Sequence, residues 1–314
     1  PDKITKGVFM CGLTGIIANN PEGLGIGLTE MLKEIEHRGR DATGFAVYEI
    51  RDDIQIRVSI RNIDSKPDLL KILEKYEQPS AANSTSGGRS YKGVGIFDFY
   101  ETSLNMPPSE IKALHHEIDS HPDLCVHSLG EKIKVYKDQG TARDLESHHR
   151  FNIGPATHGI GHVRLATESL EDINFAHPFI SEMHPELSLV HNGQFTNYFN
   201  LRRSLETKGV RFKTNNDSEI AVQYLAFLME KNGGDLEEAI HQAMDAFDGV
   251  FTIIVSTEDQ IGIFRDELGM KPVLFFETDD GSVLFGSEEI SLAKIAADVN
   301  ATEMEPGGVK VWSI

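Results

Sequence analysis

The sequence has little of several features that usually assign a protein to a class. Only two of its 314 residues are cysteines, Cys11 and Cys125, which is too few for a disulfide framework. No apolar run approaches the roughly 18 residues that a membrane-spanning helix needs. The first residues, PDKITKGVFM, lack the apolar core of a secretory signal. These absences favour a cytoplasmic protein without a membrane segment.

Basic residues are also few. The chain has 30 Lys and Arg against 49 Asp and Glu, a formal net charge of -19. A surface of this sign repels nucleic-acid phosphates and anionic lipids, so no nucleic acid and no membrane is expected as a partner. The simplest interpretation is a solvated acidic surface, and a basic partner protein is the alternative.

Strand patterns open the chain. Residues 12–18 predict a buried strand, and 25–39 predict an amphipathic helix. Strands are expected at 43–50 and 54–60, where isoleucine and valine alternate on one face of the second strand. Its other face is therefore expected to contact solvent.

Residues 62–150 have the pattern of an insertion. Two short amphipathic helices are expected at 67–77 and 108–119, and the strands 124–129 and 132–137 are predicted to pair. After the insertion, strands and helices alternate in groups. Strands are expected at 157–165, 187–193, 249–257, 261–266, 272–277, 282–286 and 308–314, and helices near 195–208, 217–231, 235–247 and 288–297. This order favours an α+β domain of stacked sheets with helices on the outer faces.

Cys11 opens the strand-like run CGLTGII. A thiol is a weak nucleophile at neutral pH until a base removes its proton, and the sequence neighbours of Cys11 offer none. If the mature chain began at Cys11, its own α-amino group, with a pKa of about 7.7–8.0, would serve as that base. The alternative is a small buried residue on the first strand, and Cys11 taken alone favours this alternative.

Other segments place polar residues at the ends of predicted elements. They are HRGRDATG (37–44), GHVRLAT (161–167), AHPF (176–179), VHNGQFTN (190–197) and NNDSE (215–219). Each is weak alone, because Arg164 has an alternative as a surface cation and Asp217 as a helix N-cap. Likewise, Asn192 and Gly193 alone would suit a simple turn.

Together these residues suit one substrate, a free amino acid with a side-chain amide. Such a substrate needs an arginine for its α-carboxylate and an acid for its α-ammonium group. Amide hydrolysis also needs a nucleophile and two hydrogen-bond donors for the tetrahedral oxyanion. An asparagine amide and the N–H of a following glycine can supply both donors.

The sequence resembles the class II glutamine amidotransferases, which are N-terminal-nucleophile hydrolases. The resemblance covers residues 11–314 and rests on eight motifs in the order of that family. These are CGLTGII, HRGRDATG, GHVRLAT, AHPF, VHNGQFTN, NNDSE, RDELGMKPV and FGSEEISL. It implies a four-layer αββα sandwich, with Cys11 as nucleophile and its α-amine as base. It also implies that Asn192 and Gly193 form the oxyanion hole.

The same resemblance implies the residues that bind glutamine. Arg164 and Asp217 would bind its α-carboxylate and α-ammonium groups. Thr167, His177 and Arg38 would line or support the pocket. No residue is assigned to a metal: the thirteen histidines raise a metalloprotein as a third class, but HGIGH (158–162) lies on a predicted strand and lacks the glutamate of a zinc-binding HExxH helix.

Further motifs resemble the stand-alone glutaminase subunits of split glutamate-synthase-like enzymes, such as N-methylglutamate synthase. The resemblance implies that the chain itself binds no cofactor and forms a hetero-oligomer with separate synthase subunits. One partner would carry an FMN-binding barrel, and another a glutamate-synthase-type β-helix. Besides FMN, an iron–sulfur cluster is a further expectation for these partners. Ammonia made from glutamine would pass to them.

Two departures and one obstacle remain. Leu165 stands where the glucosamine-phosphate branch has Trp, and Arg40 stands where Pro, Gln or Tyr is usual. Residues 1–10 precede Cys11 and hold its nitrogen in a peptide bond. They are therefore predicted to be a leader or propeptide that is removed. If Cys11 stays blocked, the chain would instead be a non-catalytic scaffold or regulatory subunit of the same fold.

Overall fold

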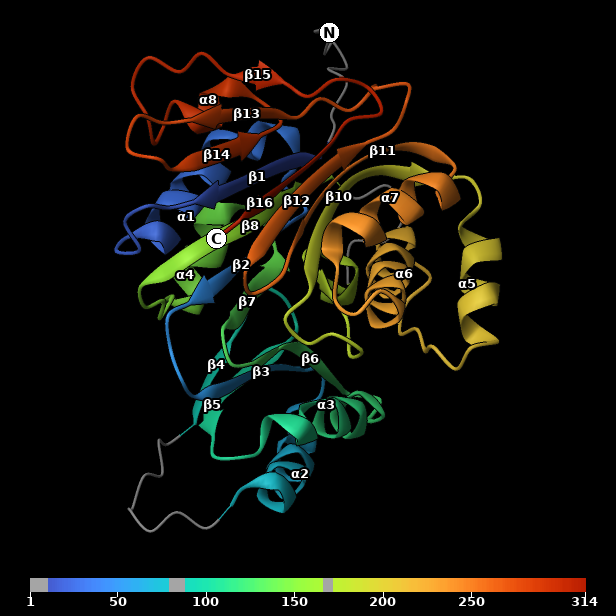
Figure 1. Ribbon diagram of the computed structural model, residues 1–314. Coiled ribbons are helices and arrows are strands. Elements are labelled where there is room, and N and C mark those ends of the chain that lie inside the picture. Colours follow the sequence, from blue (N-terminus) through green and yellow to red (C-terminus); the bar gives the residue numbers. More distant parts are fainter. Residues whose placement is uncertain (1–10, 79–87, 166–171) are drawn as a thin grey trace, which may run out of the picture.

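The computed structural model describes residues 11–78, 88–165 and 172–314. It is an α+β protein whose described sheets are all antiparallel (Figure 1). The largest sheet has seven strands in the order β15-β13-β14-β1-β8-β2-β7. Their bounds are β1 Gly12–Ile17, β2 Ala42–Glu49, β7 Ile133–Gln139, β8 Ala156–Arg164, β13 Leu274–Glu277, β14 Val283–Gly286 and β15 Thr302–Glu303. The first strand of the chain is thus a central strand of this sheet.

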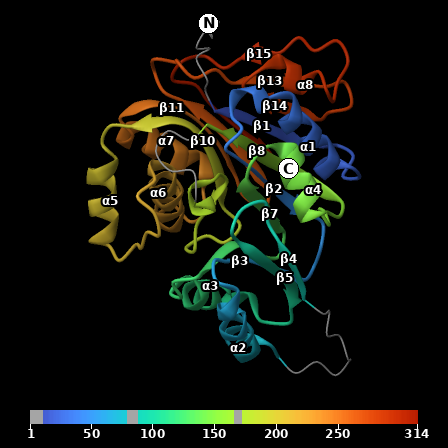
Figure 2. The same cartoon turned by 180° about the vertical axis from the view of Figure 1, so that it is seen from behind.

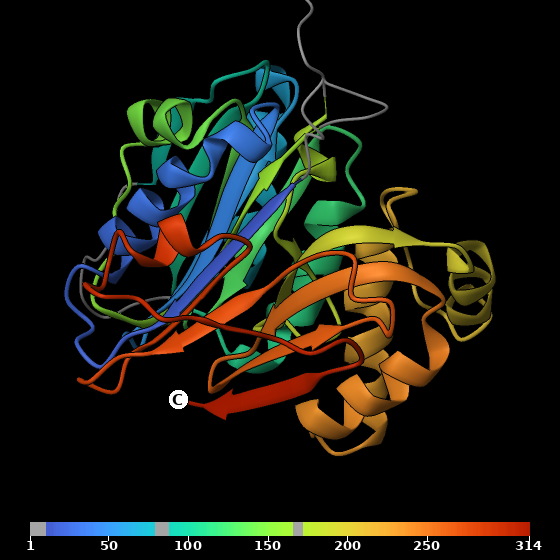
Figure 3. The same ribbon diagram turned by 90° about the horizontal axis from the view of Figure 1, so that it is seen from above.

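A second sheet has five strands in the order β16-β12-β11-β10-β9. They are β9 Phe179–Ile180, β10 Ser188–Phe195, β11 Gly249–Ser256, β12 Gln260–Arg265 and β16 Val309–Ser313. One face of this sheet packs on the seven-stranded sheet through apolar side chains that include Leu13, Ile160, Val190 and Ile254. Figure 3 shows the two sheets stacked, with helices outside each.

Helices cover the outer face of each sheet. On the seven-stranded sheet lie α1 (Leu24–Glu34), α4 (Ala142–His149) and the short α8 (Glu289–Leu292). On the five-stranded sheet lie α6 (Asp217–Lys231) and α7 (Leu236–Ala246), with α5 (Tyr198–Glu206) beside α6. Helix α1 buries Leu24, Leu28, Met31 and Leu32, at the spacing of a single helix face. The helices predicted near 217–231 and 235–247 are confirmed, whereas α8 is shorter than the predicted 288–297.

A third unit lies at the end of the molecule opposite β15 and α8 (Figures 1 and 2). Its four-stranded sheet has the order β4-β5-β3-β6. Its elements are β3 Ile54–Ile60, β4 Arg89–Lys92, β5 Asp98–Leu104, β6 Leu124–Gly130, α2 Lys66–Tyr76 and α3 Ile111–Asp119. Helices α2 and α3 pack on one sheet face around a separate apolar core. The unit therefore begins at β3, while β7 and α4, within the predicted 62–150 insertion, pack with the main body.

Two predictions for this unit are wrong. Strands 124–129 and 132–137 do not pair: β6 pairs with β3, and β7 pairs with β2 in the larger sheet. The second face of β3 is largely shielded from solvent, since Arg57 and Ser59 on it are buried and Gln55 is half-buried. That face is covered by the main body, and Arg57 donates a hydrogen bond to the carbonyl of Val135 on β7.

No helix within the described ranges combines the length and apolarity needed to span a bilayer.

Candidate active site

Cys11 lies immediately before β1, between the two stacked sheets. Its carbonyl oxygen accepts a hydrogen bond from Nε of Arg38 at 3.0 Å. It accepts a second from Nδ2 of Asn192 on β10, also at 3.0 Å. Arg38 ends the 3-10 helix Glu36–Arg38, which follows α1. Three residues that are far apart in the sequence therefore meet at one peptide oxygen, and that contact joins both sheets.

The Cys11 thiol is half-buried. Burial raises its pKa, and the nearby charges of Arg164 and Lys271 oppose the rise only in part. Its hydrogen-bond acceptor is the carbonyl oxygen of Leu165, 4.0 Å from Sγ. Among the described residues no basic side chain is within hydrogen-bond distance of the thiol. The protonated thiol consequently needs a base that the neighbouring side chains do not provide.

Arg164 ends β8, directly beside this thiol. Burial lowers the pKa of its guanidinium, and the charges of Cys11 and Asp41 act in the opposite direction. In the part of the chain that the structure describes, no carboxylate lies within salt-bridge distance of Arg164. A partly desolvated guanidinium that has no paired carboxylate among the described residues is suited to bind the carboxylate of a ligand. Thr167, predicted to lie in the same pocket, is outside the described residues.

Asn192 and Gly193 lie next to each other on β10. Gly193 has a φ of 150°, which residues with a side chain rarely adopt. A Cβ at this position would also collide with the carbonyl oxygen of Val250 on β11. Asn192 is almost fully buried and uses one amide proton for the Cys11 carbonyl. Its second amide proton is available for another acceptor, since the NH2 group donates twice.

Asp217 is the first residue of α6, but it is not the N-cap. The cap is Asn216, whose side chain accepts a hydrogen bond from the backbone N–H of Ser218 at 2.8 Å. The Asp217 carboxylate instead accepts from the N–H of Phe195 at 3.1 Å. It therefore ties the start of α6 to the end of β10, two residues beyond Gly193.

His177 is buried beneath this strand and does not contact the thiol. Its Nε2 lies 2.9 Å from the hydroxyl of Ser218, and Nδ1 of His191 lies 2.9 Å from the same hydroxyl. The ring of His162 lies 4.1 Å from that of His177, centroid to centroid. Burial holds the pKa of all three rings below the usual value, and that of His162 falls to about 3. We call His162, His177, His191 and Ser218 the histidine cluster; it supports the site as neutral groups.

Sequence reasoning missed several of these supporting residues. Glu288 accepts a hydrogen bond from Nη1 of Arg38 at 2.5 Å and so fixes the arginine that holds Cys11. Glu288 lies in the motif FGSEEISL, and Ser218 and His191 lie in NNDSE and VHNGQFTN. The motifs therefore marked the segments, although only the structure shows what these three side chains contact. Among the described residues no group of three His, Cys, Asp or Glu side chains is arranged to hold a metal ion.

Comparisons with known proteins identify the family of this chain. Residues 131–306, more than half of the chain, match the family model described as glutamine amidotransferase domain. A candidate glutamine amidotransferase of Methanothermobacter thermautotrophicus is 33% identical over 97% of this chain and 100% of its own length. The glutamine amidotransferase-like protein GlxB of Rhizobium meliloti is 32% identical over 96% of this chain and 98% of its own. The chain belongs to the class II glutamine amidotransferases.

Solved structures agree at the level of the fold. The allosteric regulatory enzyme of purine biosynthesis superposes with a TM-score of 0.61 at 18% identity, over 96% of this chain and 46% of that chain. The glutamine phosphoribosylpyrophosphate amidotransferase of B. subtilis superposes with a TM-score of 0.58, over 96% of this chain and 49% of that chain. This chain thus spans about half the length of those two proteins.

Proposed function

We propose that this chain is a glutaminase subunit, which hydrolyses glutamine to glutamate and ammonia with Cys11 as the nucleophile. The observation that carries the proposal is the position of Cys11: Arg38 and Asn192 bind its carbonyl, and its thiol lies beside Arg164, which has no salt-bridge partner among the described residues. We also propose that the order of helices, sheets and helices corresponds to the four-layer αββα sandwich of N-terminal-nucleophile hydrolases.

Substrate binding follows from the charges of the site. Arg164 would pair with the α-carboxylate of glutamine, and Asp217 with its α-ammonium group. Asp217 keeps part of its surface exposed while one of its oxygens accepts from Phe195. Thr167, His177 and Arg38 remain proposed pocket residues, of which His177 and Arg38 would act by supporting their neighbours.

The chemistry would proceed in two steps. The α-amine of a mature Cys11 takes the thiol proton, and Sγ attacks the side-chain amide carbon of glutamine. The developing oxyanion accepts from the Asn192 amide and the Gly193 N–H. The C–N bond breaks, the amine returns its proton to the leaving nitrogen, and ammonia departs from a thioester. Water then hydrolyses the thioester, which releases glutamate and restores the thiol.

We propose further that the ammonia is used by separate subunits of a glutamate-synthase-like complex, one with an FMN-binding barrel and one with a β-helix. The support is the resemblance of the motifs at residues 166–179, 190–212, 248–259 and 269–280 to stand-alone glutaminase subunits. The cofactors of that complex, FMN and an iron–sulfur cluster, would belong to the partners. Co-purification of the chain from its native cell, followed by identification of its companions, tests this proposal.

A non-catalytic scaffold is the second candidate. It is favoured by one specific observation, the half-buried thiol with a raised pKa on a residue that follows Met10 in the sequence. Intact-mass analysis of the natural protein distinguishes the two candidates. A chain that begins at Cys11 supports the enzyme, and a chain that retains residues 1–10 in the natural complex supports the scaffold.

An electrophilic glutamine analogue tests the enzyme directly. It should modify Cys11 stoichiometrically in protein that begins there, and glutamine should protect against modification. Arg164→Ala should raise the KM for glutamine, because losing one member of a desolvated charge pair costs about 2–5 kcal/mol. An unchanged KM in Arg164→Ala, or labelling at Cys125 in place of Cys11, would contradict the assigned roles.

A further inference from the structure

A cavity of about 440 Å³ lies where the four-stranded sheet meets the main body. Its charged lining consists of Arg57, Arg89, Lys134, Arg150 and Glu101, four basic side chains and one acidic. The sign is opposite to that of the whole chain, whose net charge is -19. We call this site the cationic cavity. Its size falls within the roughly 300–1,000 Å³ range of small-molecule sites.

The excess of positive charge arises from strand register. Glu101 on β5 lies opposite Arg57 on β3 and Arg89 on β4, so one carboxylate faces two guanidiniums across the sheet. Arg89 lies 2.9 Å from it, whereas Arg57 approaches only to 3.9 Å. One negative charge cannot compensate both cations. In addition, Nε of Arg89 is buried without a hydrogen-bond partner among the described residues.

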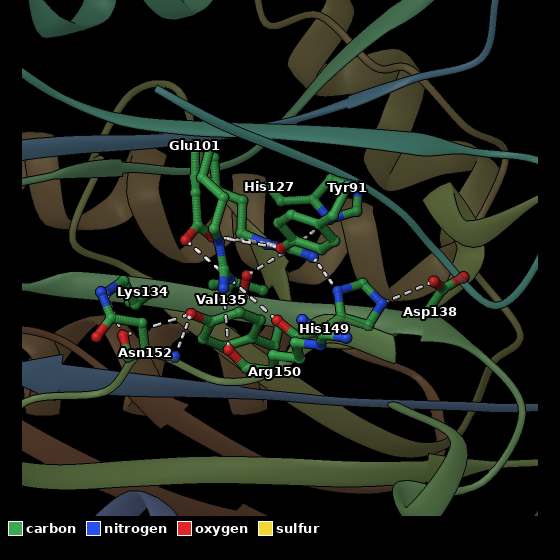
Figure 4. A network of polar contacts seen from close by, with 12 residues as sticks. Tyr91, Glu101, His127, Lys134, Val135, Asp138, His149, Arg150 and Asn152 are labelled. Carbon is green, nitrogen blue, oxygen red and sulfur yellow. Dashed lines mark hydrogen bonds and ion pairs between the residues drawn. The ribbon is translucent and has the colours of Figure 1, made fainter. Parts of the chain in front are cut away.

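Arg57 forms the floor of the cavity and is about 1% exposed. Its guanidinium donates to Nδ1 of His149 at 2.7 Å and to Nδ1 of His127 at 3.1 Å (Figure 4). Burial lowers the pKa of both rings, to about 4 for His149, so both accept as neutral groups. Nε2 of His149 lies 2.8 Å from the buried carboxylate of Asp138, which fixes the ring. The floor is therefore a cation held mainly by neutral acceptors.

The main body supplies the opposite wall. Nζ of Lys134 donates to the carbonyl of Asn152 at 2.6 Å and lies 3.3 Å from Glu49. Arg150 follows α4 and lies at the mouth, with its side chain exposed. Its guanidinium has no hydrogen-bond or ion-pair partner among the described residues. The carbonyl of Arg150 accepts from Nη1 of Arg89 at 3.1 Å, which brings the two arginines together.

We propose that the cationic cavity binds a small organic anion, through a carboxylate or phosphate group that Arg89 and Arg150 hold above Arg57. Guanidinium groups suit both kinds of anion because their planar forks match the oxygens. Ile56 and Phe151, which also line the cavity, would contact the carbon skeleton. Because the walls belong to two units, the bound anion would join the four-stranded unit to the main body. The site is separate from the residues around Cys11, so the proposal does not depend on the proposed function.

Calorimetric titration of the full chain with inorganic phosphate and, separately, with succinate tests this site. We expect saturable binding of at least one probe at low ionic strength, weakened by added salt. Arg89→Gln should weaken it on the order of tenfold, as for a lost hydrogen bond between charged groups. Arg150→Gln at the mouth should weaken it about threefold. Binding of phosphate alone would identify a phosphate ligand, and binding of succinate alone would identify a carboxylate.

Two controls separate the cavity from other cations. Arg203→Gln makes the same charge change on the exposed face of α5 and should leave binding unchanged. Arg164→Ala removes the arginine beside Cys11 and should leave unchanged the binding that depends on Arg89 and Arg150. The proposal is overturned if neither probe binds, if Arg203→Gln weakens binding as much as Arg150→Gln, or if only Arg164→Ala abolishes it. If Arg89→Gln fails to fold, Arg150→Gln still decides, because the Arg150 guanidinium has no hydrogen bond or ion pair to lose among the described residues.

Discussion

Two groups of buried histidines differ in what they hold. In the histidine cluster beside the candidate active site, His177 and His191 share the hydroxyl of Ser218, and no cationic side chain of the described residues hydrogen-bonds to their rings. In the four-stranded unit and its contact with the main body, His127 and His149 accept from the buried Arg57. A neutral cluster leaves the charges of Arg164 and Asp217 available to a substrate. Around His127 and His149 the charge is on the supporting residue, Arg57, so this charge stabilises the fold as well as lining the cavity.

From this comparison we expect substitutions at the candidate active site to remove activity without changing stability. Cys11→Ala in protein that begins at this residue should abolish glutamine hydrolysis, because the atom that forms the thioester is absent. Unfolding by urea should be nearly unchanged, since the hydrogen bonds to Cys11 use its backbone carbonyl. Measurable glutamine hydrolysis by the variant would show that another group is the nucleophile.

A smaller loss of activity is expected on substitution of Asn192, the proposed oxyanion donor. Asn192→Ala should lower kcat about 10²–10³-fold while KM changes little, because the donor acts mainly in the transition state. Steady-state kinetics with glutamine measures both constants. A change confined to KM would place Asn192 in ground-state binding instead.

In the four-stranded unit the expected loss is of stability. Arg57→Met should lower the free energy of unfolding by about 3 kcal/mol, because buried acceptors on Val135, His127 and His149 lose their donor. The folded fraction should keep its kcat for glutamine. Arg203→Met on exposed α5 is the matched control and should change stability by less than about 0.5 kcal/mol. Equal effects of the two substitutions would remove the distinction between the regions.

The smallest effect is a dependence of stability on pH. Burial holds the pKa of His149 and His158 at about 4 and that of His162 at about 3 in the folded chain, against 6.5 in the unfolded chain. Their contribution to the free energy of unfolding is complete above pH 6.5 and is lost as the pH falls toward 4, since only the unfolded state takes up protons there. In this window each such ring lowers the free energy of unfolding by about 1.4 kcal/mol for each unit by which the pH falls. Urea unfolding measured from neutral pH downward would reveal it, and a flat profile would show that the rings are already protonated or hydrated.

The sequence predicts the residues of the candidate site more fully than their contacts. Cys11, Arg164, Asn192 and Asp217 are predicted because each lies in a motif at an end of a strand or at the start of a helix. The meeting of Cys11 with Asn192 across two sheets could not be derived, because spacing along the chain does not encode which sheet faces which. The alternative of Asp217 as a helix N-cap is wrong, because Asn216, one residue earlier, provides the cap.

The four-stranded unit was harder to derive for two physical reasons. An alternating strand with a charged residue on one face normally indicates solvent on that face, so the face of β3 that carries Arg57 is predicted to contact solvent. Its actual partners, Tyr91, His127 and His149, lie 34–92 residues further along the chain. Strands β6 and β7 have similar apolar patterns whichever neighbour they pair with, so their adjacency in sequence suggested a hairpin that does not form.

The hydrogen bonds to Cys11 have a consequence for maturation. Arg38 and Asn192 both donate to the carbonyl oxygen of Cys11. Strand pairing of this segment with β8 begins only at the next residue, Gly12. None of these contacts uses the nitrogen of Cys11. Cleavage of the preceding peptide bond would therefore convert the nitrogen of Cys11 from an amide to an amine without altering the hydrogen bonds that hold this residue. If residues 1–10 are removed as proposed, the precursor and the product would share one folded framework, and activation would need bond scission without refolding.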